Sequence, residues 1–143
     1  MGIGVPPRLL VDTHALVWWW TDDQRLPAAA RAAIADEESV VLVSAASAWE
    51  LSTKHRLGKW ADVARIVEGF GDLVRRSRFR DLPITLAHAV RAGSLGGTHR
   101  DPFDRMLIAQ AQAEPAVIVT GNPVFRGYNI PVIWDAASTS ASP

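Results

Sequence analysis

Short apolar runs, set apart by segments with helical spacing, constrain the fold of this chain more than any other feature. Residues 9–11, 40–43 and 117–120 form such runs, and each is bounded by polar residues. This pattern is typical of strands buried on both faces of a parallel sheet. Strands alternating with helices predict a three-layer α/β/α domain with a mostly parallel central sheet. Residues 82–84 and 130–134 are expected to form short edge strands, since proline cannot donate a ladder hydrogen bond.

Polar residues in front of the helical segments predict where helices begin. The expected helices cover residues 15–20, 28–36, 63–74 and 86–92, and a further one carries Glu50 and ends near Gly58. The expected N-caps are Thr13, Ser44 or Ser47, and Thr85. Trp18, Trp19 and Trp20 cannot all face one core, because successive helical residues lie about 100° apart. Two are expected inside, and the third on the surface or in a protein interface.

Composition limits the class of protein. The chain has 143 residues, 48% of them hydrophobic, which predicts a single globular domain over residues 1–143 with flexible ends at 1–7 and 136–143. Fifteen basic residues balance fifteen acidic ones, so binding of nucleic acid would need a local basic patch. Residues 75–80 contain such a run, which is alternatively a solvated face. The chain has no cysteine, which excludes disulfides and thiolate zinc sites.

Targeting and membrane signals are absent from the sequence pattern. The first seven residues lack the long apolar run of a signal peptide. No apolar run reaches the length of about 20 residues that a membrane span needs. The sequence therefore predicts a cytoplasmic protein that makes no membrane contact.

The segment Asp101-Pro102-Phe103-Asp104 places two carboxylates three residues apart at the start of an apolar helix. Proline fits the first helical position, which makes Asp101 the expected N-cap and Asp104 a first-turn residue. Residues at i and i+3 share a helix face, so both carboxylates point the same way. One interpretation is that they only favour the helix start through its dipole. The position of the other acidic residues decides whether they also form a site.

Acidic residues from distant parts of the chain are expected at one edge of the sheet. Asp12 directly follows the first strand, and Glu50 lies in the helix after the second. Asp101 and Asp104 open a helix on the same edge, and Asn122 follows the strand that ends at Thr120. Glu50 also pairs with Lys54 at i,i+4, which is alternatively a surface ion pair, although the helix start around Glu50 is otherwise apolar.

Carboxylates that meet at this edge need a cation, because like charges raise one another's pKa values. Oxygen ligands without histidine or cysteine favour Mg²⁺ or Mn²⁺ over zinc. A carboxylate-held divalent ion suits hydrolysis of a phosphodiester backbone. A small-molecule phosphatase is a further alternative. However, the segment Asp12-Thr13-His14 lacks the second aspartate, two residues later, that such enzymes usually carry.

Three segments together resemble PIN-domain ribonucleases, most closely the toxins of VapBC-type toxin–antitoxin pairs. They are Leu10-Val11-Asp12-Thr13-His14, then Ser44 to Leu51 with Lys54 and Leu57-Gly58-Lys59, then His99 to Arg105. The resemblance implies that Asp12, Glu50 and Asp104 bind Mg²⁺ or Mn²⁺ and act in catalysis, with Asp101 as an additional carboxylate. Many members carry an aspartate where this chain has Asn122, which favours one ion over two.

The resemblance also implies an activity and partners. It implies a metal-dependent endoribonuclease that cleaves cellular RNA as the toxin of a type II toxin–antitoxin pair. The implied partners are a small antitoxin and a second copy of the chain, with exposed tryptophans as candidate contacts. Candidate residues that support the site or contact RNA are Asn122, Thr13, Lys54, Arg100 and Arg105. For Arg105, an ion pair with the adjacent Asp104 is the favoured alternative. A nucleic-acid-binding or regulatory PIN-like module with impaired catalysis is the alternative function.

Overall fold

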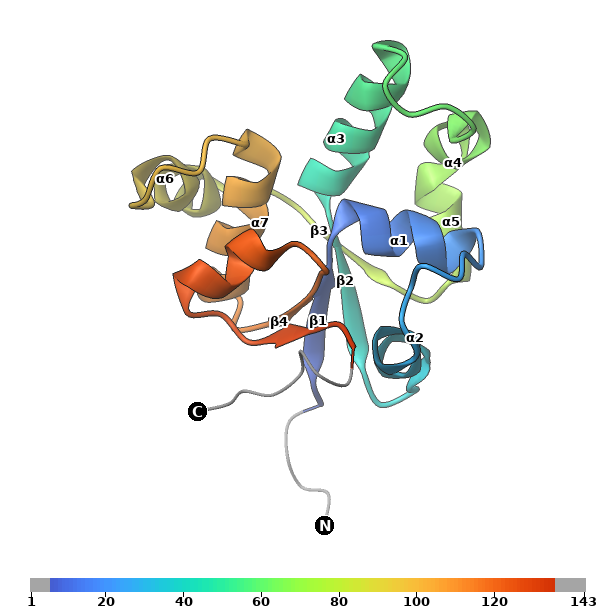
Figure 1. The fold of residues 1–143 in the computed structure, drawn as a ribbon, viewed down its shortest axis with the longest axis horizontal. Coiled ribbons are helices and arrows are strands. Elements are labelled where there is room, and N and C mark those ends of the chain that lie inside the picture. Colours follow the sequence, from blue (N-terminus) through green and yellow to red (C-terminus); the bar gives the residue numbers. More distant parts are fainter. Residues whose placement is uncertain (1–5, 136–143) are drawn as a thin grey trace.

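The computed structural model describes residues 6–135 and has a five-stranded sheet at its centre. Every strand pairs in parallel, in the order β3-β2-β1-β4-β5. The predicted three-layer fold is confirmed, and Figure 1 shows helices on both faces of the sheet. The elements in chain order are β1 (Arg8–Val11), α1 (Thr13–Trp20), α2 (Ala28–Ala35), β2 (Val40–Ser44), α3 (Ala45–Arg56), α4 (Ala64–Glu68), α5 (Phe70–Arg76), β3 (Arg80–Leu82), α6 (Leu86–Ser94), α7 (Pro102–Ala113), β4 (Val117–Val119), the 3₁₀ helix η1 (Pro123–Tyr128) and β5 (Val132–Ile133).

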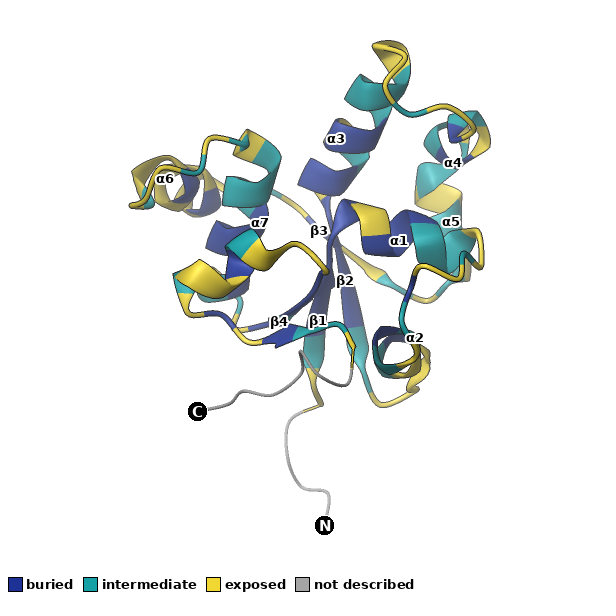
Figure 2. Ribbon diagram, viewed as in Figure 1, coloured by how far each residue is buried: buried dark blue, intermediate teal, exposed yellow. Residues whose placement is uncertain are grey.

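Successive side chains along each central strand point to opposite faces of the sheet, and each face packs into its own hydrophobic core. Leu10 and Ile118 face α7 on one side of the sheet, where they pack with Phe125 of η1. Leu9 and Val11 face the opposite side, where they pack against α1 and α2. Figure 2 shows that the central strands are the most buried part of the fold. Burial on both faces explains why these strands are continuous apolar runs.

The edge strands lie close to the expected positions, with one shift. β3 ends at Leu82, directly before Pro83, so the strand lies two residues earlier than predicted. Proline explains the end, because its nitrogen has no hydrogen to donate to β2. β5 pairs with β4 at the opposite edge of the sheet, inside the predicted range 130–134.

Two helical predictions need correction. The segment expected as one helix over residues 63–74 is two short helices, α4 and α5, which meet at Gly69. The three consecutive tryptophans are all partly buried, so none is the exposed residue that the sequence predicts. All three pack against the core between the sheet and helices α1 and α2. Trp18 and Trp20 also contact a second apolar cluster, which α1, α3 and α4 form.

Two further predictions concern the ends of the chain and the membrane. Residues 1–5 and 136–143, expected as flexible ends, lie outside the described residues. Pro7, expected in the same flexible end, is described, and its carbonyl accepts a hydrogen bond from the backbone N–H of Val40 at 2.8 Å. The longest helices between residues 6 and 135 have 12 residues, and none is long and apolar enough to cross a bilayer.

Candidate active site

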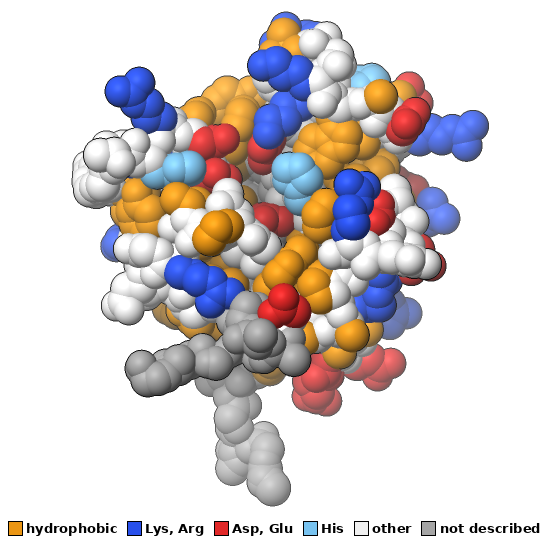
Figure 3. Space-filling view, in the orientation of Figure 1, with side chains coloured by type: hydrophobic (Ala, Val, Ile, Leu, Met, Phe, Trp, Pro, Cys, Tyr) orange, Lys and Arg blue, Asp and Glu red, His pale blue; other side chains and the backbone are white. Residues whose placement is uncertain are grey.

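The candidate site is a pocket at the carboxyl-terminal edge of the sheet, where α1, α3 and α7 begin. It has a volume of about 130 Å³. In Figure 3, acidic side chains gather near the middle of the face that contains it. The residues that line it are Asp12, Thr13, His14, Glu50, Lys54, Asp101, Asp104, Leu107 and Asn122. The four predicted carboxylates therefore share one pocket with Thr13, Lys54 and Asn122, whereas Arg100 and Arg105 do not line it.

Asp12 lies at the base of this pocket, 8% exposed, between the end of β1 and the start of α1. Its Oδ1 accepts a hydrogen bond from the backbone N–H of Ala15 at 2.8 Å, and its Oδ2 accepts one from the Thr120 hydroxyl. Asp12 is thus the N-cap of α1, which corrects the prediction that Thr13 caps this helix. Burial raises the pKa of Asp12 to about 6, with a contribution from Asp104, although both hydrogen bonds oppose the rise.

Glu50 is 5% exposed, so its pairing with Lys54 is not a surface ion pair between two solvated side chains. Thr13 donates its hydroxyl hydrogen to Oε1 at 2.6 Å, and the Lys54 ammonium donates to Oε2 at 2.6 Å. The Lys54 side chain is 31% exposed. Burial lowers its pKa, but the hydrogen bond and charge of Glu50 outweigh burial and leave the pKa raised. Lys54 therefore brings a permanent positive charge to the pocket.

Asp101 and Asp104 have different partners at the start of α7. Asp101 is the predicted N-cap, and its Oδ1 accepts the backbone N–H groups of Phe103 at 2.9 Å and Asp104 at 3.1 Å. The Oδ2 of Asp104 lies 2.8 Å from Nε2 of His99. Burial raises the pKa of Asp104, and the charges of Asp101 and Glu50 add to the rise. Helix capping and membership of the pocket are therefore compatible, because Asp101 does both.

Asn122 lies where β4 leads into η1. Its Oδ1 accepts the backbone N–H of Val124 at 3.1 Å, so it caps η1 and lines the pocket at the same time. An amide adds an oxygen to the pocket without adding negative charge.

The hydroxyl of Thr120 and the ring of His99 each hold a carboxylate of the pocket. Sequence reasoning did not single out Thr120, although its place directly after the β4 apolar run is the signal that could have found it. His14 also lines the pocket and stacks on Trp60 with ring centroids 4.5 Å apart. Burial lowers the pKa of His14, although the charge of Glu50 opposes the shift.

Arg105 contacts backbone carbonyls and not the carboxylate of Asp104. Its guanidinium donates to three backbone carbonyls: Nε to Ala92 at 3.1 Å, Nη1 to His99 at 3.0 Å and Nη2 to Leu95 at 2.5 Å. Among the described residues it therefore forms no ion pair with Asp104. Arg105 instead fixes the segment between α6 and α7, where carbonyls without strand or helix partners need donors. Arg100 is exposed and takes part in none of the hydrogen bonds found within residues 6–135.

Replacing Arg105 with alanine is expected to lower the free energy of unfolding by about 2–3 kcal/mol, because three partly buried carbonyls lose a charged donor. Arg100→Ala is the matched control, and its change should stay within about 0.5 kcal/mol. Urea denaturation measures both. Equal stability of the two variants would contradict the anchoring role of Arg105.

The donor set of the pocket suits a hard divalent cation. Four carboxylates and one amide offer oxygen ligands, and each carboxylate has lone pairs beyond those that its present hydrogen bonds use. The raised pKa values of Asp12 and Asp104 have a component from neighbouring carboxylates, which a cation would relieve. Within residues 6–135, however, no three Asp, Glu or His side chains are grouped as a metal site. Instead, Asp12 accepts a hydrogen bond from Thr120, Glu50 accepts from Thr13 and Lys54, and Asp104 contacts His99.

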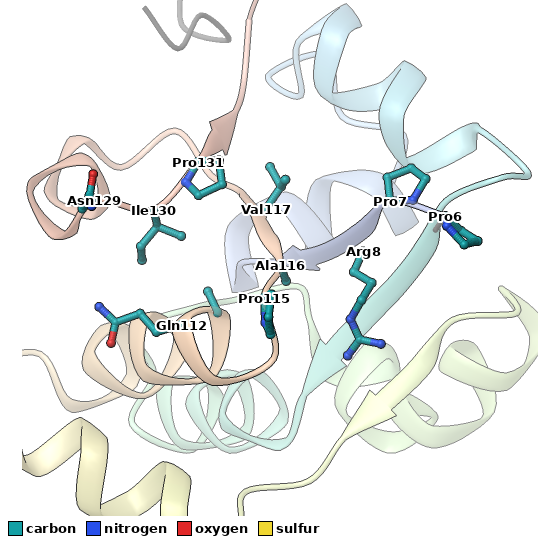
Figure 4. Close-up of a pocket in the computed structure, with 11 residues that line it drawn as sticks. Pro6, Pro7, Arg8, Gln112, Pro115, Ala116, Val117, Asn129, Ile130 and Pro131 are labelled. Carbon is teal, nitrogen blue, oxygen red and sulfur yellow. The ribbon is translucent and has the colours of Figure 1, made fainter. Parts of the chain in front are cut away.

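A larger pocket of about 400 Å³ lies at the opposite edge of the sheet, near the start of β1 and β4 (Figure 4). Pro7, Pro115 and Pro131 contribute to its lining, and Arg8 is its one charged side chain among the described residues. Arg8 is already engaged, since its Nη2 lies 3.5 Å from Oε1 of Glu114. The lining of this pocket is therefore mainly apolar, whereas the four candidate carboxylates lie at the other edge.

The strand order explains why the acidic pocket forms where it does. From β1 the chain moves to β2 on one side, and β4 returns on the other side of β1. The end of β1 is therefore the switch point at which α/β sheets open a crevice. Asp12 lies there, and the fold and pocket define an α/β/α domain with an acidic site at its switch point.

Comparison with known proteins gives the family. The model of the PIN domain family matches residues 9–130, so the chain belongs to the PIN domain family. No sequence match was found among curated proteins.

Three solved structures have a similar fold. VapBC-1 from nontypeable Haemophilus influenzae is 15% identical with a TM-score of 0.63, covering 87% of this chain and 96% of that chain. VapBC2 from Rickettsia felis, bound to a DNA fragment from its promoter, is 16% identical with a TM-score of 0.58, covering 87% and 96%. The PIN domain endonuclease Utp24 is 14% identical with a TM-score of 0.50, covering 90% and 85%.

Proposed function

We propose that this protein is a metal-dependent endoribonuclease and that the acidic pocket is its active site. The observation that carries the proposal is the meeting of Asp12, Glu50, Asp101 and Asp104 in one pocket, although they come from three separate segments. Membership of the PIN domain family supports the same activity, since a similar structure belongs to a PIN domain endonuclease.

The proposed metal ligands are the carboxylates of Asp12, Glu50, Asp101 and Asp104, which would hold Mg²⁺ or Mn²⁺. A bound ion of this kind supplies charge neutralisation at the scissile phosphate and lowers the pKa of a water molecule. The hydroxyl of Thr13 orients Glu50 in the pocket. Asn122 adds no charge, so the carboxylates are better matched to one ion than to two.

Two cations near the pocket are proposed to bind the RNA backbone. The Lys54 ammonium lines the pocket and keeps its charge, and Arg100 is exposed directly before Asp101. Phosphate contacts of this kind position a nucleic acid without reading its sequence. Since the net charge of the chain is +0, local cations have to provide this attraction.

The biological role that we propose is that of a cytoplasmic toxin. The VapBC structures of similar fold support it, because VapBC proteins are toxin–antitoxin pairs. The proposed partners are a small antitoxin, which would cover the pocket, and a second copy of the chain. Expression of the chain should arrest bacterial growth, and co-expression of the protein encoded by the adjacent reading frame should relieve the arrest. Growth that continues at full rate would contradict the role as a toxin.

RNA cleavage tests the proposed activity directly. The purified chain should cut single-stranded RNA in Mg²⁺ or Mn²⁺ but not in EDTA, and Glu50→Gln should slow cleavage on the order of a hundredfold. Glu37→Gln is the matched control, since Glu37 is an exposed carboxylate in the turn before β2. Binding of RNA without cleavage under all of these conditions would favour the alternative, a regulatory module. Equal rates for the two variants would contradict the proposed site.

Addition of Mn²⁺ should stabilise the folded chain, because only the folded state brings the carboxylates together. At a concentration one hundred times the dissociation constant, the expected gain is about 2.7 kcal/mol. A thermal-denaturation series across Mn²⁺ concentrations measures the effect. The Glu37→Gln variant should respond as the wild type does, whereas Asp104→Asn should respond less. An equal response of all three would place the ion elsewhere.

A further inference from the structure

The residues directly before two of the proposed metal ligands are aromatic, and their rings touch. Trp49 precedes Glu50 in α3, and Phe103 precedes Asp104 in α7. Their ring centroids lie 4.9 Å apart with an interplanar angle of 81°, which is a T-shaped contact between the two helices. An aromatic contact therefore joins α3 to α7, and each of its rings is one residue away from a carboxylate that lines the pocket.

A second aromatic pair lies on the α1 side of the pocket. His14 of α1 stacks on Trp60, which follows α3, with an interplanar angle of 27°, and His14 itself lines the pocket. In Figure 3, hydrophobic side chains lie on both sides of the acidic side chains near the middle of the face. His14 therefore connects this second pair to the pocket directly, whereas Trp49 and Phe103 are connected to it through Glu50 and Asp104, the lining residues that follow them.

Trp49 is 59% exposed, whereas the other five tryptophans are partly buried. A T-shaped contact covers at most one face of a ring, so Phe103 leaves at least one face of Trp49 uncovered. Phe103 limits the orientations of the Trp49 side chain, which lowers the entropy lost when a flat ligand stacks on it.

We propose that Trp49, with Phe103 behind it, stacks on the nucleobase of a nucleotide next to the phosphate in the pocket. His14 and Trp60 take the base on the other side. This inference rests on the proposed nuclease function and assigns the residues that receive an unpaired base of its RNA substrate. Bases in a duplex are stacked on one another, whereas unpaired bases present a ring face to aromatic side chains.

The surroundings of Trp49 favour a nucleotide over an apolar protein segment. Glu50, the next residue of α3, lines the acidic pocket together with Lys54 and Asp101. A partner protein with an apolar contact would need an apolar surface to continue around the ring. A nucleotide combines a flat aromatic base with a charged phosphate, and the mixture of aromatic and charged groups here matches that chemistry.

The test is a double-mutant cycle between the protein and the RNA. The probe is a fluorescently labelled ten-nucleotide single-stranded RNA, alone or with one abasic nucleotide at each position in turn. Binding is measured by anisotropy in Ca²⁺, with intact probe checked on a gel. Trp49→Ala should weaken binding about tenfold, and Trp49→Phe should recover most of the loss. Leu86→Ala, which removes an 87% exposed side chain from α6, is the matched control and should change nothing.

The abasic probes identify the stacked base. At one position, the missing base should weaken binding to the wild-type chain about tenfold and have no further effect on Trp49→Ala. In cleavage assays, Trp49→Ala should raise KM by a similar factor and leave kcat within about twofold, because the ring binds substrate and performs no chemistry. Duplex RNA should compete at least tenfold less well than single-stranded RNA.

The outcomes separate this inference from the proposed function. If Trp49→Ala binds RNA as the wild type does, while wild-type cleavage needs Glu50, only the stacking role is overturned, and Trp49 is left as a protein contact. Equal competition by duplex RNA overturns it as well. If one missing base weakens binding to the wild type but not to Trp49→Ala, and no condition supports cleavage, the stacking role is supported and the nuclease proposal is contradicted.

Discussion

Replacing Asp12 with asparagine is expected to abolish RNA cleavage and to make the folded chain more stable. Cleavage should fall on the order of 10³-fold, because a proposed metal ligand loses its charge. Stability should rise because the folded chain holds a buried carboxylate whose pKa is about 6, against 3.8 for an ordinary aspartate. Asparagine keeps an oxygen for the Ala15 N–H and can still pair with Thr120, so the helix cap survives.

The stability gain should depend on pH in a defined direction. Because the pKa is raised on folding, the folded state binds the proton more tightly between pH 3.8 and 6, and the wild-type chain loses stability as the pH rises through that window. The asparagine variant has no such titration. The difference in free energy of unfolding should be near zero at pH 4 and reach about 1–3 kcal/mol above pH 6.

Urea denaturation at pH 4, 5, 6, 7 and 8 measures this difference. Asp81→Asn is a suitable control, because Asp81 is an exposed carboxylate of β3 outside the acidic pocket. A variant that is less stable than the wild type at pH 8, or one that cleaves RNA at the wild-type rate, would contradict the assignment. Gain of stability with loss of activity is the expected behaviour of a residue kept for function.

Replacing Phe125 with alanine is expected to lower the free energy of unfolding by about 3–5 kcal/mol. Phe125 is fully buried, and its ring fills the core between η1 and one face of the sheet, beside Leu10 and Ile118. Deleting the ring leaves a cavity that the surrounding strands cannot close, because they are fixed by parallel pairing on both sides. The measurement is the shift of the urea midpoint at constant slope.

Val124→Ala is the matched control for this variant. Val124 is the residue before Phe125 and only partly buried, so its change should cost about 1 kcal/mol. A Phe125→Ala variant no less stable than Val124→Ala would show that η1 is not part of the core. A changed slope would instead indicate that unfolding is no longer two-state.

The fold was predictable because its strands have a pattern that helices rarely share. Runs such as residues 40–43 are too short for a helix and apolar on both faces, which left a buried parallel strand as the interpretation. Side chains at helix starts were also informative where proline followed, as at Asp101. At Asp12 the prediction was wrong by one residue, because Thr13 is an equally good capping type and only the backbone conformation distinguishes them.

The candidate site was predictable as a set of residues but not as a set of contacts. The edge to which Asp12, Glu50 and Asp104 belong followed from topology alone. The hydrogen-bond partner of Asp12 did not follow from topology, because Thr120 lies 108 positions away and is brought near only by the finished fold. Arg105 shows a related limit: its neighbour in sequence suggested an ion pair, whereas three carbonyls between Ala92 and His99, in the preceding segment, accept its hydrogens.

The pairing of β1 with β4 has a consequence for the growing polypeptide. Leu10 and Ile118 are partners in the sheet, and Thr120 reaches back to Asp12 across 108 positions of the chain. A chain synthesised only as far as residue 100 contains Asp12 and Glu50 but neither Asp104 nor Thr120. Any cleavage by the proposed site must therefore await synthesis of residues 104 to 120, so an unfinished copy that stops before them holds no assembled site.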